Sequence, residues 1–244
     1  MNELIRSEFR KLRTTRGVFG LAAGALALIA LAVIGIVKDS SVAELSGPLH
    51  SRGFLNVLPI LLPVFLLAIG IRSFTEEFRH GSIVPTLLAS PRRRRVLLAK
   101  LVTTTAVVGL IVVAAEAVAI GLGLTLATAQ GATITIAAGS VAASIGTLLA
   151  VAVLWAGIGV GVGLIVTHQA AALVGAVIWL LLGEQLVGAV WSGAARFLPA
   201  GAANGVFGSE PGLLAPLAAG SVLAGWAAAS LAAGALVMDR RDIA

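Results

Sequence analysis

Two glutamates within otherwise apolar stretches are the side chains best suited to chemistry inside a membrane. Glu116 and Glu184 each lie well inside a long run that holds no other charged residue, and helix rise places them at similar depth. An unpaired carboxylate in hydrocarbon is costly, so each carboxyl must be protonated, hydrogen-bonded or facing water. Three interpretations stay open: a neutral carboxyl bonded to a neighbouring helix, with Gln185 as a candidate partner; a polar lining of a translocation path, for example for cationic amphiphiles; or a proton relay.

The residue types exclude several other kinds of site. The chain has no cysteine and only three histidines, far apart in sequence, so we expect no metal centre. None of its lysines, Lys11, Lys38 and Lys100, follows a glycine, so it lacks the Gly-Lys-Ser/Thr loop that holds nucleotide phosphates. We therefore expect no cofactor on this chain. The basic run 92–95 flanks an apolar stretch and is expected to face lipid headgroups rather than nucleic acid.

The elements that position these residues must be membrane helices. Hydrophobic residues make up 59% of the 244 residues and charged residues only 11%, which is too little charge to cover a soluble domain of this size. About 20 apolar residues cross a bilayer as a helix. These runs predict one transmembrane domain over residues 1–244 with six spans, at about 17–37, 53–71, 101–128, 137–166, 170–190 and 213–238. The sequence thus predicts an all-α integral membrane protein.

The distribution of basic residues predicts the orientation of the spans. Fourteen of the seventeen lysines and arginines precede span one, lie between spans two and three, or follow span six. Only Lys38, Arg52 and Arg196 lie on the other side. Positive charge marks the cytoplasmic side, so both termini are expected there. The bias toward arginine and the richness in alanine, glycine and valine favour a bacterial cytoplasmic membrane as the location.

Two segments outside the spans are predicted to be short helices on that side. Residues 1–16 form an amphipathic interfacial helix whose apolar face is interrupted by Glu8, which indicates either a headgroup anchor or a protein partner for Glu8. In the loop 73–100, Gly81 suits the end of span two and Ser82 the cap of a new helix over 83–89. Ile83, Leu87 and Leu88 on that helix need a cover: the membrane, the rest of the chain or another protein.

The loop also carries an ordered set of residues that points to a family. In order, these residues are Glu77, Gly81, Ser82, Ile83, Leu87, Leu88, Pro91, Arg94 and Lys100. This order resembles the cytoplasmic signature of the permease subunits of type-two ATP-binding-cassette (ABC) exporters, although members of that family usually have threonine where Ser82 stands. The segment 7–12, which contains Glu8, is similar to their N-terminal elbow helix, and the six-span layout agrees.

The resemblance implies a division of labour between chains. The helix over 83–89 would be the coupling helix that docks on an ABC ATPase subunit, and ATP and Mg²⁺ would bind to that partner rather than to this chain. It also implies a second permease subunit, as a homodimer or a heterodimer, within the lipid bilayer. The function expected is therefore ATP-driven export by a chain that is not itself an enzyme. A proton-coupled secondary transporter using Glu116 and Glu184 is the alternative, followed by a membrane enzyme using the pair Glu76-Glu77.

The sequence also predicts where helices pack closely and how the loop before the last span folds. Gly157 and Gly161 in span four, and Gly20 and Gly24 in span one, are four residues apart and are expected to allow close helix packing. The loop 191–212 is too apolar to be free in solvent. We expect it to form a re-entrant or interfacial hairpin before the last span, a feature that related exporters carry.

Overall fold

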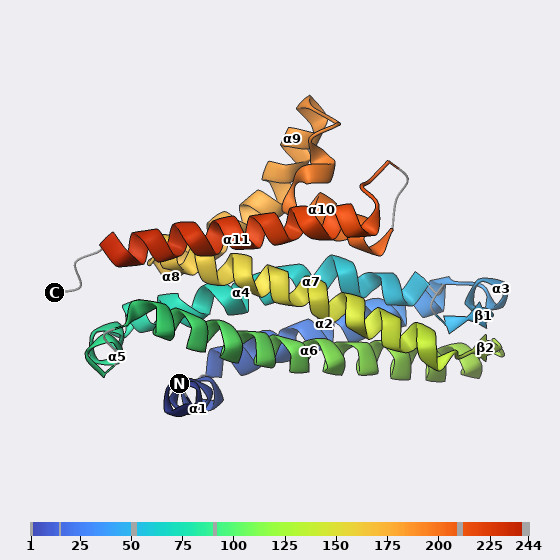
Figure 1. The fold of residues 1–244 in the computed structure, drawn as a ribbon. Helices are drawn as coiled ribbons and strands as arrows, with labels where there is room; N and C mark the ends of the chain where they lie inside the picture. Colours follow the sequence, from blue (N-terminus) through green and yellow to red (C-terminus); the bar gives the residue numbers. More distant parts are fainter. Residues whose placement is uncertain (1, 15, 50–52, 90–91, 209–211, 241–244) are drawn as a thin grey trace.

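The fold is an all-α bundle whose elements follow one another with short connections (Figure 1). The computed structural model describes every residue except 1, 15, 50–52, 90–91, 209–211 and 241–244. In the first half the elements are α1 (Asn2–Thr14), α2 (Arg16–Asp39), α3 (Val42–Leu45), β1 (Gly47–Pro48), η2 (Gly53–Asn56), α4 (Val57–Arg79), α5 (Ile83–Ala89) and α6 (Arg93–Ala129). In the second half they are β2 (Ile134–Thr135), α7 (Ala138–Ile165), α8 (Gln169–Ile178), η3 (Trp179–Gly183), α9 (Glu184–Val190), η4 (Ala195–Phe197), α10 (Pro199–Phe207) and α11 (Pro216–Arg240).

Six helical segments of the described chain are long and apolar enough to cross a membrane, as the sequence predicts. They are Gly17–Asp39, Gly53–Arg79, Arg93–Ala129, Ala138–Ile165, Gln169–Val190 and Pro216–Arg240. A helix satisfies all of its interior backbone groups, which is the condition for crossing hydrocarbon. The third segment begins at Arg93, eight residues before the expected span, so the helix extends beyond its apolar stretch and carries Lys100.

The end of α4 and the start of α5 follow the expected chain geometry. Gly81 has a φ of +66°, a left-handed conformation that glycine adopts without the steric cost of a Cβ atom. The amide of Gly81 donates to the carbonyl of Phe78, which closes α4. The Ser82 carbonyl then accepts the amide and the hydroxyl of Thr86, so α5 begins immediately after the turn.

Helix α7 is the centre of the bundle and packs against α4 on one side and α11 on the other. Two thirds of its most apolar window (67%) is buried, the largest share among the six spans. Glycines make the close approach to α4. A Cβ atom at Gly163 would lie 2.5 Å from the Ile71 carbonyl oxygen, and one at Gly159 would overlap the Leu67 carbonyl oxygen. Gly70 of α4 makes the same close approach from the other side, because a Cβ atom added there would lie 2.5 Å from the Ala156 carbonyl oxygen of α7.

The four expected packing glycines differ in how closely another helix approaches them. A Cβ atom at Gly161 would overlap the Ser230 backbone of α11, and one at Gly157 would reach ordinary contact with Ala227 at 3.5 Å. Gly24 would also make only an ordinary contact, 3.7 Å from Phe65. Gly20 packs against no other helix of the described chain: a Cβ atom there meets nothing within 4 Å, because Gly20 lies on an exposed face of α2.

At the end of the bundle opposite α1 and α5, short elements join the connections (Figure 1). Strands β1 and β2 form a two-residue parallel pair that links the segment after α2 to the segment after α6. The expected hairpin before the last span contains η4 and α10, and α10 packs against α11. The indole Nε1–H of Trp226 on α11 donates to the Phe197 carbonyl at 2.8 Å, which fastens η4 to the last span.

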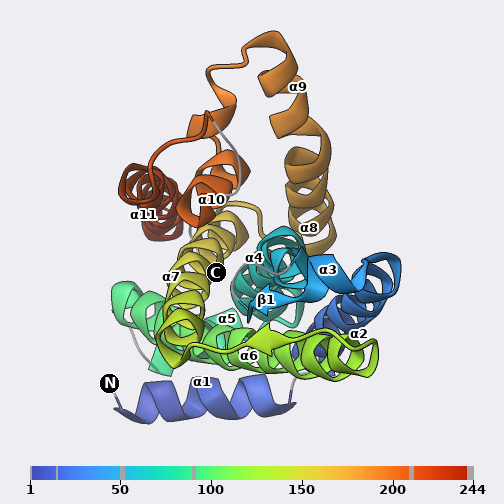
Figure 2. The ribbon, with the colours of Figure 1, turned by 90° about the vertical axis from the view of Figure 1, so that its right-hand side faces the viewer.

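The fifth span, which comprises α8, η3 and α9, diverges from the rest of the bundle (Figures 1 and 2). Only 6% of its most apolar window is buried, against 22% or more for the other five. Its middle, η3, is a π-helix of about one turn. This wider turn changes the direction in which the side chains after it point around the helix axis. Glu184 follows directly after this wider turn. The span therefore presents large apolar side chains outward, with Leu181, Leu182 and Leu186 all exposed.

Candidate functional site

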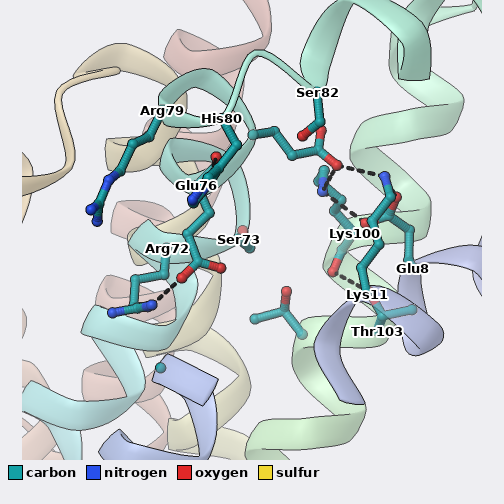
Figure 3. Close-up of a pocket in the computed structure, with 13 residues that line it drawn as sticks. Glu8, Lys11, Arg72, Ser73, Glu76, Arg79, His80, Ser82, Lys100 and Thr103 are labelled. Atoms are coloured by element: carbon teal, nitrogen blue, oxygen red, sulfur yellow. Dashed lines mark hydrogen bonds and ion pairs between the residues drawn. The ribbon is translucent and has the colours of Figure 1, made fainter. Parts of the chain in front are cut away.

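Four charged side chains from three helices meet at the end of the bundle where α1 crosses it, and we call them the charge cluster: Glu8, Lys11, Glu77 and Lys100. Lys100 Nζ of α6 lies 2.7 Å from Glu8 Oε2 of α1 and 2.9 Å from Glu77 Oε1 of α4. Lys11 Nζ completes the ring, at 2.7 Å from Glu8 Oε1 and 2.6 Å from Glu77 Oε1 (Figure 3). The cluster thereby ties α1 to two membrane helices.

The structure therefore brings together three of the residues that the sequence singled out, Glu8, Glu77 and Lys100. All three are almost completely buried. Lys11 is the member that sequence reasoning missed as a site residue. The sequence contained features that could have identified it. Lys11 is one of only three lysines, and it follows Glu8 by three residues, a spacing that places both side chains on one helix face.

In the charge cluster, the ion pairs and hydrogen bonds together affect the pKa values of Glu8 and Lys11 more than burial does. Burial raises the pKa of Glu8, but Lys100 and then Lys11 oppose this and hold that pKa below its ordinary value of 4.5. Burial likewise lowers the pKa of Lys11, yet hydrogen bonds to Glu77 and Glu8 bring it above its ordinary value of 10.5. Two carboxylates and two ammonium groups leave no net charge. Removing one partner would leave an uncompensated charge in a buried site.

The cluster also reaches the short helix α5. Lys11 Nζ donates to the hydroxyl of Thr86 on α5 at 3.2 Å. Lys100 Nζ additionally lies 5.2 Å from the centroid of the Phe74 ring on α4, a cation–π contact. A displacement of α5 therefore acts directly on the side chains that join α1, α4 and α6.

The side chains of α5 have two different environments. Ile83 is 4% exposed and packs in a small apolar cluster with Phe74 and Met238 of this same chain. Leu88 is 78% exposed and Val84 is also exposed. Of the three covers that the sequence left open, the rest of the chain is the one that covers Ile83, which anchors α5 to the bundle. Val84 and Leu88 are on the outward face.

The other residues of the expected coupling set are placed as follows. Gly81 and Ser82 form the turn into α5, and Arg94 is exposed on the first turn of α6. Pro91 and the side chain of Leu87 lie outside the described residues. Further polar contacts surround the turn: Arg72 pairs with Glu76 within α4, and the guanidinium of Arg93 donates to the Met238 carbonyl of α11.

Glu116 is buried between α6 and α7. Its side chain is 1% exposed, and its Oε1 accepts the hydroxyl of Ser144 at 2.8 Å. Its Oε2 is buried without a hydrogen-bond partner among the described residues. Ser144 thus supplies the contact to a neighbouring helix that one interpretation of the sequence required.

Glu184 is held by a backbone group. Both of its carboxyl oxygens accept the Ala200 amide, at 2.9 and 3.2 Å. Helix α10 has no side-chain cap of its own at Leu198, and Pro199 has no amide hydrogen, so Ala200 provides the first donor of that helix. Gln185, the candidate partner, is exposed, and the contact to Glu184 comes from the Ala200 amide. The two carboxyls contact different elements.

Comparison with known proteins places this arrangement in a family. A search of curated proteins found no match. The family model described as ABC-2 family transporter protein matches residues 4–183, which include most of α1, all of α5, the four members of the charge cluster and Glu116. The match covers most of the chain and agrees with the six membrane-crossing helices. This chain therefore belongs to the ABC-2 transporter family, whose members are the multi-pass membrane components of ABC transporters.

Proposed function

We propose that this chain is the permease subunit of an ATP-driven exporter and that a separate ABC ATPase docks on α5. One observation carries the proposal: α5 presents Val84 and Leu88 outward while Thr86, on the same helix, contacts the charge cluster. A partner that moves α5 would therefore move the joint between α1, α4 and α6. A docking helix without such a joint could hold a partner but could not pass its motion to the membrane helices.

The charge distribution supports a cytoplasmic position for α5. Helices α1 and α5 and the last turns of α11 gather at one end of the bundle (Figure 1), and the residues predicted to be cytoplasmic include fourteen of the seventeen basic side chains. ATPase subunits act on the cytoplasmic side. Cysteine introduced at Arg92 should resist labelling by an impermeant maleimide in intact cells, whereas cysteine at Ala43 or Ser192 should react. The reverse pattern would overturn this orientation.

The fifth span supports the proposal of a second permease subunit. A six-span chain encloses no symmetric path by itself, and α8, η3 and α9 leave an almost wholly exposed apolar face. Either a copy of this chain or a related permease would pair with it in the bacterial cytoplasmic membrane.

The two alternatives receive no specific support from the geometry. A proton-coupled transporter would use Glu116 and Glu184, yet one contacts Ser144 and the other contacts α10. A membrane enzyme would use Glu76 and Glu77, yet these form ion pairs with Arg72 and with the two cluster lysines. No group of metal-ligating side chains occurs within the described part of the chain.

The decisive experiment is copurification of the native complex in mild detergent. Leu88→Glu should abolish recovery of the ATPase, because it places a charge on the exposed face of α5. Leu88→Met is the matched control, since it keeps the site apolar and should retain the ATPase. Equal recovery with both variants, at wild-type levels of membrane insertion, would refute docking on α5.

A further inference from the structure

A polar cavity has the charge cluster as part of its wall and lies between α1, the first turn of α2, the last turns of α4 and residues 100–104 of α6 (Figure 3). Its volume is about 510 Å³, which is enough for a small polar molecule rather than for one or two waters. Gly17 at the start of α2 contributes bare backbone to the wall, and a Cβ atom there would overlap the guanidinium of Arg72. The cavity therefore lies where α1 meets the ends of the apolar helices.

Three buried polar atoms of this cavity have no hydrogen-bond partner among the described residues: Arg72 Nε, Glu77 Oε2 and Thr104 Oγ1. Only two other side-chain atoms of the described chain share that condition, Glu116 Oε2 and Trp155 Nε1. Thr104 is 1% exposed and Glu77 5%, so bulk solvent barely reaches either side chain. Buried polar groups are almost always hydrogen-bonded, to protein, to ordered water or to a ligand, and these three gather at one cavity that is large enough for a polar ligand.

The chemistry of the three atoms defines that ligand. The Nε–H of Arg72 and the hydroxyl of Thr104 donate, which suits anionic oxygens. Glu77 Oε2 can only accept, which requires a donor on the same ligand. The ionisable lining is close to balanced, because four lysines and arginines face three glutamates. A ligand that carries both a phosphate and an ammonium or hydroxyl group meets all of these conditions, whereas an anion with no O–H or N–H group leaves Glu77 Oε2 without a donor.

The position of the cavity identifies the source of such a ligand. The amphipathic helix α1 lies across the bundle end, where the apolar stretches stop and lipid phosphates are found (Figure 2). We propose that the cavity binds the headgroup of a phospholipid from the adjacent leaflet. Its phosphate contacts Arg72 and Thr104, and its ammonium or hydroxyl group donates to Glu77. This inference does not depend on an ATPase partner, so the two proposals can fail separately.

The test is calorimetric titration of the detergent-purified chain with dihexanoyl-phosphatidylethanolamine. Thr104→Val keeps the shape of the side chain and removes the hydroxyl, and should weaken binding about fivefold. Arg72→Gln should weaken it about tenfold or more, since it removes a charge-assisted donor. The matched controls are Thr105→Val, one residue along the same helix and outside the cavity lining, and Arg94→Gln, an exposed arginine at the same end. Both controls should bind as the unaltered chain does.

Two competitors distinguish the sources of the phosphate. Glycerophosphoethanolamine, which has the headgroup without acyl chains, should displace the lipid, and inorganic phosphate should displace it only weakly. Phosphate that competes as well as the headgroup, with the same loss in Thr104→Val, would overturn the lipid assignment in favour of a simple anion site. Binding that is equal in Thr104→Val and Thr105→Val would overturn the site altogether, because the hydroxyl would then make no contact with the ligand.

Discussion

Lys100 and Glu8 are 92 residues apart in sequence, yet their charged atoms lie 2.7 Å apart and both side chains are buried. Lys100 is on a membrane helix and Glu8 on the helix that crosses the end of the bundle, so this contact fixes one against the other. A hydrophobic contact at the same place would tolerate sliding. The paired charges do not, because a small displacement would leave both charges unpaired while their side chains stay buried.

The first prediction concerns this contact. Lys100→Met should destabilise the protein by about 3 kcal/mol, because Glu8 and Glu77 would then share only Lys11. Lys38→Met is the matched control: Lys38 is exposed and should tolerate the change. The thermal unfolding midpoint of the purified protein measures both. If Lys100→Met unfolds at the temperature of Lys38→Met, the cluster contributes nothing to stability.

The second prediction concerns pH. The folded pKa of Glu8 lies below its unfolded value, so its ion pairs stabilise the protein at neutral pH. That stabilisation should begin to disappear as the pH falls below about 4.5 and should be lost once the pH passes the folded pKa. Unfolding midpoints measured from neutral to acid pH should therefore fall less steeply in Glu8→Gln, which has no carboxylate to protonate. Parallel profiles for the two proteins would contradict this.

The third prediction concerns Glu184 as a cap of α10. Glu184→Leu removes both acceptors of the Ala200 amide and should loosen the first turn of α10 by about 1 kcal/mol. Glu184→Gln keeps one acceptor and should retain both the turn and any cargo-stimulated ATPase activity of the complex. Hydrogen exchange at Ala200 measures the turn, with Gln185→Leu as the control. Loss of stimulation in Glu184→Gln with normal exchange would instead indicate a role for the charge in transport.

The fourth prediction compares two glycines. Gly159→Ala should destabilise the bundle by about 1–3 kcal/mol, because the new methyl group overlaps backbone of α4 that cannot move aside. Gly20→Ala should be neutral or slightly stabilising, since the same methyl group meets open space and alanine favours the helix. Chemical or thermal unfolding of the two variants in the same detergent measures the difference, and equal midpoints would refute the close approach of α4 and α7.

The local features of this protein could be predicted from its sequence. The six helices followed from apolar runs that match the thickness of a bilayer, a condition that involves no distant residue. The turn at Gly81 and the start of α5 followed from residues within one helical turn of each other. The order Glu77, Gly81, Ser82 and its continuation indicated the family, which the family model then confirmed.

The pairings between distant residues were decided only by the tertiary structure. Any of seventeen basic side chains could have matched Glu8 by charge, and nothing local distinguishes Lys100. Ile83 and Leu88 are both aliphatic residues of one short helix, yet packing against Met238 buries the first and leaves the second exposed. Likewise, Gly20 and Gly161 have similar sequence neighbours, but only Gly161 has a helix against it. A side chain's type limits which contacts it can make, whereas the choice among them depends on which helices the fold brings within a few ångströms.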